Sequence, residues 1–227
     1  MRVMVPDLPE REALEPLPDG FEVATYAPGS APDLGGVELL VPDEIDARRL
    51  EAVLAAAPDL RILQTFSAGV DWLLPRVPAG LTVASASVVH AESVAEWVLA
   101  VVLADLKDLP RWTAAQREHR WKDGDVELGD LRGARVLIAG HGAIGAAVEA
   151  RMAPFGARVT RVARRARPGT HATGELPELL GEADVVVVLM PLTDATRRLF
   201  DAPLLARMRD GALLVNAARG AIVDQDA

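Results

Sequence analysis

Short apolar runs separated by glycine- and proline-rich turns dominate the first third of the chain. Such runs predict strands over residues 2–5, 22–26, 37–41, 60–65 and 81–85. The segment 43–57 has helical spacing instead, with Ile45, Leu50 and Leu54 on one face. Strands that alternate with a helix are typical of a parallel sheet. We therefore predict one small α/β domain over residues 1–88.

A second series of apolar runs fills residues 89–227. These runs predict buried strands over 136–139, 158–163, 183–190 and 211–216, and helical spacing predicts helices over 91–109, 146–155 and 201–208. The segment 91–109 is apolar most of the way around, so we expect it to be buried on two sides. It fits the interior of one domain as well as an interface between domains or subunits.

A glycine turn follows the strand predicted at 136–139. The run Gly140-His141-Gly142-Ala143-Ile144-Gly145 has the Gly-x-Gly-x-x-Gly spacing between a strand and a helix, which is the context of a dinucleotide-binding turn. Gly140 permits the tight turn, Gly142 lets the main chain approach a pyrophosphate, and Gly145 lets helix and strand pack closely. The helix N-terminus supplies N–H groups for the phosphates. The alternative is a glycine turn in an α/β protein of another kind.

Arginines end the next strand of this unit. In NAD-binding sites an acidic side chain at this point accepts hydrogen bonds from the adenosine ribose. Here Arg164 and Arg165 follow Ala163, and no carboxylate is nearby in the sequence. Because a guanidinium binds phosphate through a planar fork of donors, the pattern favours the 2′-phosphate of NADP. The alternative is a solvated basic loop.

Three further loops follow predicted strands, at the sheet edge where α/β proteins bind ligands. In the loop 66–71, the N–H groups around Ser67, Ala68 and Gly69 are candidates to cradle a carboxylate, although such a turn is also common without a ligand. The loop from Pro191 to Thr196 follows the strand at 183–190, where a cofactor would lie. The last strand leads into Ala217, Ala218 and Arg219, and Arg219 is a candidate ligand of a substrate anion or an ordinary surface arginine.

Composition narrows the class of protein. Half of the residues are apolar and the net charge is −9, with no cluster of Lys and Arg among aromatic residues, so we expect no nucleic-acid surface. The absence of cysteine excludes disulfides and thiolate nucleophiles. The longest wholly apolar run, 97–104, is too short for a bilayer span, and the N-terminus lacks the core of a signal peptide. We therefore predict a cytoplasmic protein without membrane contact, and no metal site, since the histidines and carboxylates lack ligand spacing.

Five motifs in this order resemble the D-isomer-specific 2-hydroxyacid dehydrogenase family, which includes D-3-phosphoglycerate dehydrogenase and the glyoxylate/hydroxypyruvate reductases. They are Ser67–Asp71, Glu92–Glu96, Gly140–Gly145, Pro191–Thr196 and Asn216–Asp224. The resemblance covers essentially the whole chain. It implies a flavodoxin-like substrate domain followed by a doubly wound parallel-sheet Rossmann domain that binds the cofactor, and a homodimer joined through the cofactor domain.

The resemblance also implies roles for individual residues. Ser67, Ala68 and Gly69 would bind the carboxylate of a small 2-keto or 2-hydroxy acid, and Arg219 would be the catalytic arginine that polarises the 2-keto oxygen. The cofactor-binding residues would be Gly140, Gly142, Ala143, Ile144, Gly145, Arg164, Arg165, Pro191, Thr196, Ala217 and Ala218. The arginine pair resembles the NADP-preferring members, so we expect NADP(H) to be preferred and NAD(H) to be possible.

Family members continue past the position that corresponds to Ala227. The part beyond it carries their catalytic Glu and the His that protonates the keto oxygen, so we expect the sequence to be part of a longer protein. An alternative function is a non-enzymatic, dinucleotide-responsive binding protein on the same fold, as in the corepressors of this family, or an inactive fragment. Neither the substrate nor the oligomeric state follows from the sequence.

Overall fold

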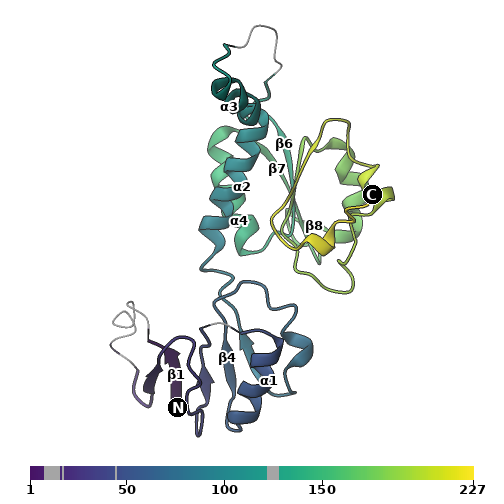
Figure 1. The fold of residues 1–227 in the computed structure, drawn as a ribbon. Helices are drawn as coiled ribbons and strands as arrows, with labels where there is room; N and C mark the ends of the chain where they lie inside the picture. The colour runs from purple at the N-terminus through teal and green to yellow at the C-terminus, as the bar shows by residue number, and fades with distance from the viewer. Residues whose placement is uncertain (8–15, 17, 44, 122–127) are drawn as a thin grey trace. The chain divides into compact units, whose positions relative to one another are not determined.

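The computed structural model describes residues 1–7, 16, 18–43, 45–121 and 128–227 (Figure 1). The chain forms two compact units, Met1–Val89 and His90–Ala227, each built around its own sheet. Among the helices in these ranges, none combines the length and the apolarity that a bilayer span requires.

The first unit is a parallel sheet of five strands with the order β2-β1-β3-β4-β5. Its strands are β1 (Arg2–Pro6), β2 (Glu22–Tyr26), β3 (Leu39–Leu40), β4 (Ile62–Gln64) and β5 (Thr82–Ala84). This order is that of flavodoxin, as predicted. In such a fold the carboxyl ends of the strands lie at one edge of the sheet, so the loops after β3 and β4 are neighbours.

Helix α1 (Ala47–Ala56) packs its apolar side on this sheet. It begins later than the predicted residue 43 because Asp46 has an extended backbone and caps the helix: its side chain accepts a hydrogen bond from the N–H of Arg49 at 2.8 Å. Leu50 on α1 and Leu63 on β4 are fully buried in the core of this unit.

The second unit is also a five-stranded parallel sheet, with the order β10-β9-β6-β7-β8. Its strands are β6 (Arg135–Ala139), β7 (Arg158–Ala163), β8 (His171–Ala172), β9 (Val185–Val188) and β10 (Leu213–Asn216). Counted from β6, this is the Rossmann order of a doubly wound sheet, and it confirms the predicted fold class.

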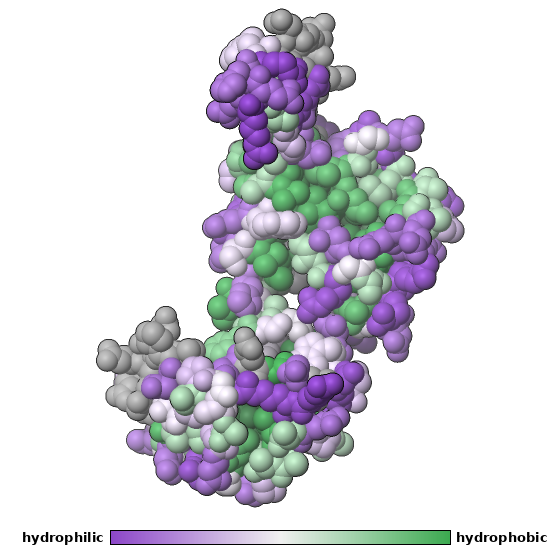
Figure 2. Space-filling model, in the orientation of Figure 1, coloured by the Kyte–Doolittle hydropathy of each residue, from purple (hydrophilic) through white to green (hydrophobic). Residues whose placement is uncertain are grey.

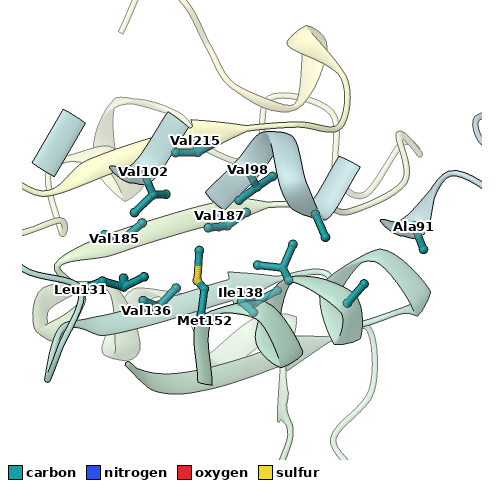
Figure 3. Packing of buried hydrophobic residues seen from close by; sticks show 13 residues of the cluster. Ala91, Val98, Val102, Leu131, Val136, Ile138, Met152, Val185, Val187 and Val215 are labelled. Carbon is teal, nitrogen blue, oxygen red and sulfur yellow. The ribbon is translucent and has the colours of Figure 1, made fainter. Parts of the chain in front are cut away.

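Helices cover both faces of this second sheet. The covering helices are α2 (Ala91–Leu106), α4 (Ala143–Met152), α5 (Leu176–Leu179) and α6 (Ala202–Leu205), and α3 (Leu109–Arg117) packs on α2. On one face, side chains from α2 and α4 pack on Ile138 and Val187 of the central strands (Figure 3). The intervening residues of the same strands, such as Leu137 and Val186, point to the other face and pack against α5, α6 and Phe200.

Several predicted boundaries were wrong, for local reasons. The helix predicted over 91–109 ends at Leu106, because Asp108 has a φ of 50° and interrupts it before α3 begins. The helix predicted from residue 146 begins at Ala143, directly after the glycine turn. Asp201 is not part of α6 but caps it, accepting a hydrogen bond from the N–H of Leu204 at 3.0 Å.

Candidate functional site

Two of the glycines in the turn after β6 lie where a side chain would collide with the main chain. Gly140 has a φ of +116°, and a Cβ there would lie 2.5 Å from the carbonyl carbon of Leu189, in the loop after β9. A Cβ on Gly145 would lie 2.6 Å from the carbonyl oxygen of Gly140 and 3.2 Å from Ile138 Cγ2. These two glycines therefore bring the turn close to β9 and α4 close to β6.

Gly142 is different, because it faces open space. A Cβ added there would meet no atom within 4 Å. Gly142 precedes α4, and its carbonyl accepts the first helical hydrogen bond, from the N–H of Ala146 at 2.9 Å. The N–H groups of Ala143, Ile144 and Gly145 therefore come before the first bonded amide, at the positive end of the helix dipole. An open surface with amide donors fits a pyrophosphate.

A chain of polar contacts connects the glycine turn with α4 and β7. His141 Nε2 lies 2.7 Å from Glu149 Oε2, and Arg161 Nε donates to both oxygens of Glu149, at 2.8 and 3.0 Å. The hydrogen bond from Arg161 is the main reason why the pKa of Glu149 is lowered, with His141 adding to the effect against the cost of burial. Glu149 is therefore an ionised carboxylate that forms an ion pair with Arg161.

The loop after β7 carries exposed arginines and no carboxylate. The side chains of Arg164 and Arg165 form no ion pair within the described part of the chain. The guanidinium of Arg167 crosses to the glycine turn, where Nη2 donates to the carbonyl oxygen of His141 at 2.7 Å. Three guanidinium groups next to a dinucleotide turn fit a phosphate better than a ribose hydroxyl pair.

In the loop from Pro191 to Thr196, the predicted residue Thr196 closes the loop on itself. Its Oγ1 donates to the carbonyl oxygen of Pro191 at 2.7 Å and accepts a hydrogen bond from the N–H of Thr193 at 2.8 Å. The loop begins beside the glycine turn, since the N–H of Leu189 donates to the carbonyl of Ala139 at 2.7 Å. Thr196 therefore shapes a loop at the same edge of the sheet as the glycine turn.

The segment after β10 is held by Asn216, for which sequence reasoning gave no role. Asn216 Oδ1 accepts from the N–H of Ala218 at 3.0 Å, and Nδ2 donates to the carbonyl oxygen of Arg219 at 2.9 Å. The N–H of Ala217 donates to the carbonyl of Val188 at 3.1 Å. The half-buried side chain of Arg219 follows this segment. The sequence feature that could have predicted this role is an Asn at a strand end, because its side-chain amide commonly forms hydrogen bonds with the main chain of the next residues.

The carboxyl edge of the second sheet thus brings together four predicted segments: the turn 140–145, the arginines after β7, the loop 191–196 and the residues 217–219. The parallel neighbours of β6 are β7 and β9, which explains this convergence. The predicted carboxylate-binding residues Ser67, Ala68 and Gly69 lie in the other unit, Met1–Val89.

The loop after β4 is tied down by small polar groups. Ser67 Oγ donates to the carbonyl of Gly69 at 3.1 Å, and the N–H of Gly69 approaches the same Oγ at 3.3 Å, which is a long hydrogen bond. The buried hydroxyl of Thr65 donates to the carbonyl of Ser67 at 3.0 Å. Within the described residues, the N–H of Ala68 has no acceptor. This N–H is therefore available to a ligand.

A hollow of about 540 Å³ adjoins this loop, lined also by the loop after β3 and the first turn of α1. Arg49 Nη2 lies 2.7 Å from Asp43 Oδ1, and Asp43 also accepts a hydrogen bond from the N–H of Gly29 at 2.5 Å. The hydroxyl of Tyr26 accepts from the N–H of Asp43 at 2.8 Å, and burial is the main reason why the pKa of Tyr26 rises to about 12. The ion pair of Arg49 and Asp43 therefore forms part of the lining of this hollow. The described residues contain no group of three or more metal-ligating side chains there or elsewhere.

Comparison with known proteins places this arrangement in a family. Residues 99–227 match the model of the D-isomer specific 2-hydroxyacid dehydrogenase, NAD binding domain. Over 183 residues, which make up 77% of this chain, the sequence is 37% identical to D-3-phosphoglycerate dehydrogenase of Mycobacterium bovis. That match covers 34% of the relative, so the chain spans about a third of the length of such relatives.

Solved structures agree over nearly the whole chain. The NADPH-dependent glyoxylate/hydroxypyruvate reductase of Sinorhizobium meliloti, solved with NADP and sulfate, superposes with a TM-score of 0.78 at 28% identity, covering 99% of this chain and 75% of that one. A D-isomer specific 2-hydroxyacid dehydrogenase of Xanthobacter autotrophicus, solved with NADPH and MES, has the same TM-score of 0.78 and identity of 28%, covering 99% of this chain and 74% of that one. The chain therefore belongs to the D-isomer-specific 2-hydroxyacid dehydrogenase family.

Proposed function

We propose that the protein is an NADPH-preferring reductase of small 2-keto acids. The observation that carries this proposal is the pairing of a dinucleotide turn with arginines after β7 and no carboxylate at that strand end. The family gives the class of reaction, and the arginines give the cofactor preference. A solved relative that carries this activity and this cofactor in its name supports the same assignment.

On this proposal the second unit holds the dinucleotide. The N–H groups of Ala143 and Ile144 and the open surface at Gly142 hold the pyrophosphate. Arg164 and Arg165 bind the 2′-phosphate. The loop around Pro191 and Thr196 and the main chain at 217–218 line the same edge. When bound, NADPH supplies the hydride that reduces the keto carbon.

The remaining predicted residues act on the substrate. The N–H groups of Ala68 and Gly69 and the hydroxyl of Ser67 bind its carboxylate. Gly69 would exchange its long contact with Ser67 Oγ, at 3.3 Å, for a shorter bond to a charged oxygen. Arg219 stabilises the negative charge that develops on the keto oxygen. Its main chain is already fixed by Asn216, so little reorganisation is needed at the moment of reaction.

Dimerisation through the second unit and a cytoplasmic location remain predictions. The dimer is supported by the surface of α2, where Trp97 is 52% exposed. Figure 2 shows hydrophobic residues gathered on the visible face of this unit beside α2, with hydrophilic residues around them. Exposed apolar surface of this kind is typical of a subunit interface.

The test is a comparison of steady-state rates of the complete protein with NADPH and NADH, using glyoxylate and hydroxypyruvate. We expect a higher kcat/KM with NADPH, and a loss of that preference in Arg164→Ala/Arg165→Ala. Equal efficiency with both cofactors would contradict the assignment of the arginines. If the dinucleotide changes oligomeric state or partner binding without turnover of any keto acid, the protein is a binding protein on this fold instead.

A further inference from the structure

Arg167 connects two parts of the dinucleotide site that are 26 residues apart in the sequence. Its Nη2 donates to the carbonyl oxygen of His141 at 2.7 Å and lies 3.3 Å from His141 Nδ1. The other ring nitrogen of His141 lies 2.7 Å from Glu149 Oε2 on α4. A proton on Nε2 lets Glu149 accept a hydrogen bond and leaves Nδ1 to accept from Arg167. The three side chains therefore form one connected chain.

The main chain of Arg167 is also fixed. Arg167 and Thr170 exchange two backbone hydrogen bonds, at 3.0 and 2.8 Å. Pro168 and Gly169 occupy the corner of this turn, and the φ of +71° at Gly169 is that of the glycine in a type II turn. Thr170 is only 7% exposed. The side chain of Arg167 thus extends from a rigid turn toward a rigid acceptor.

The charge of Arg167 is not neutralised in the described part of the structure. Arg161, on β7, is paired with Glu149, whereas the exposed side chain of Arg167 forms hydrogen bonds to His141 and no ion pair with a described residue. A guanidinium has five N–H donors, so several remain for a ligand. In a doubly wound sheet the adenosine ribose lies between the glycine turn and the end of the second strand. Arg167 spans these two places.

We propose that Arg167 is a specificity-determining residue, which binds the 2′-phosphate of NADP while its bond to the carbonyl of His141 holds it against the glycine turn. This inference rests on the proposed function and adds a third arginine to the predicted pair. It also assigns a positioning role to His141, whose ring is oriented by Glu149.

The experiment measures binding of two probes that lack the nicotinamide. Adenosine 2′,5′-bisphosphate and 5′-AMP differ only by the 2′-phosphate, and both are titrated into the complete protein by calorimetry. For Arg167→Ala, we expect affinity for the bisphosphate to fall about tenfold, as for the loss of charge-assisted hydrogen bonds, with affinity for 5′-AMP within about twofold of wild type. Arg167→Lys keeps the positive charge but lacks the planar set of guanidinium donors, so we expect it to recover only part of the affinity for the bisphosphate.

Arg158→Ala is the matched control. Arg158 is also exposed and lies at the opposite end of β7, roughly 17 Å along the strand from Ala163, so its removal changes the net charge by the same amount at a distance from the proposed site. We expect it to leave both affinities unchanged. An unchanged ratio of the two affinities in Arg167→Ala would overturn the inference, and so would an equal fall in both affinities or full recovery by Arg167→Lys. A wild-type protein that binds both probes equally would instead overturn the proposed preference for NADP.

Discussion

The side chain of Asn216 holds the main chain of Arg219. Its Nδ2 donates to the carbonyl oxygen of Arg219 at 2.9 Å while its Oδ1 accepts from the N–H of Ala218 at 3.0 Å. Both bonds form within three residues of the end of β10, so the strand's rigidity extends to the proposed catalytic arginine. Arg219 itself needs no regular secondary structure to be positioned.

We therefore expect Asn216→Ala to lower kcat/KM for keto-acid reduction about tenfold. The loss of two hydrogen bonds, each of about 1 kcal/mol, loosens the segment that carries Arg219. Arg219→Ala removes the charge itself and should lower kcat/KM by about a hundredfold or more. Fluorescence titration with NADPH should show nearly unchanged cofactor affinity in Arg219→Ala.

Asn216→Asp is the control for this prediction. An aspartate still accepts from the N–H of Ala218, but it replaces the donor to the carbonyl of Arg219 with a negatively charged oxygen that repels this carbonyl, so we expect kcat/KM to be no higher than in Asn216→Ala. Wild-type kcat/KM in Asn216→Ala would show that Asn216 does not position Arg219.

The glycine turn gives a prediction that separates folding from binding. Gly145→Ala places a Cβ 2.6 Å from the carbonyl oxygen of Gly140, so we expect a lower melting temperature, although alanine favours a helix. Gly142→Ala meets no atom within 4 Å and has a φ of −98°, so the melting temperature should be unchanged. In Gly142→Ala only NADPH affinity should fall. Equal melting temperatures in the two variants would contradict this account.

Strands were predictable where β-branched and apolar residues lie between turns that contain glycine or proline. The bounds of β2 and β7 matched the prediction residue for residue, and both sheet orders followed the predicted classes. The strand β8 was missed, because an alternation of apolar and polar residues cannot be recognised in only two residues. Helix α3 was missed as well, because it is separated from α2 by the left-handed backbone conformation of Asp108, which the hydropathy pattern does not reveal.

The site was predictable only as segments. Motif spacing predicted the turn 140–145 and the arginine pair, because both follow directly from strand ends, and the family resemblance gave Arg219 its expected role. Contacts between side chains from distant segments have no signature in one sequence. The bonds from Arg167 to His141 and from Arg161 to Glu149 join residues 26 and 12 positions apart, and only the folded chain brings them together.

Stability at low pH should depend on Asp184, the residue directly before β9. Its carboxylate accepts from both the N–H and the guanidinium of Arg135, and these bonds lower its pKa from 3.8 to about 2. A lowered folded-state pKa stabilises the protein above the unfolded value, and this contribution is lost as the pH falls through about 2. We expect Asp184→Asn to lower the free energy of unfolding by about 2 kcal/mol at pH 7 and by about half as much near pH 3.

Urea unfolding at both pH values, followed by circular dichroism, measures this difference. Asp210→Asn is the control, because this exposed carboxylate forms no ion pair within the described residues, and it should behave as wild type at both pH values. A destabilisation by Asp184→Asn that does not shrink between pH 7 and pH 3 would show that the carboxylate's charge is not the cause.

The hollow beside Ser67–Gly69 should disfavour phosphorylated substrates. Its lining holds two carboxylates, Asp43 and Asp46, and one guanidinium, Arg49, which is already paired with Asp43. On the proposed function, a keto acid bound at Ser67–Gly69 with its remaining groups in the hollow would lie next to this net negative lining, which would repel a phosphate dianion. Although the chain is 37% identical to a D-3-phosphoglycerate dehydrogenase, we expect kcat/KM for hydroxypyruvate to exceed that for its 3-phosphate at least about tenfold.

Asp46→Asn tests the cause, because asparagine caps a helix as well as aspartate does and only the charge is removed. The variant should keep the wild-type melting temperature and its rate with hydroxypyruvate, while its kcat/KM for the 3-phosphate rises several-fold. The rise should diminish at high salt, which screens the repulsion. A wild-type preference for the phosphorylated substrate would mean that a cation outside this lining binds the phosphate, and the charge of the hollow would then not decide the substrate.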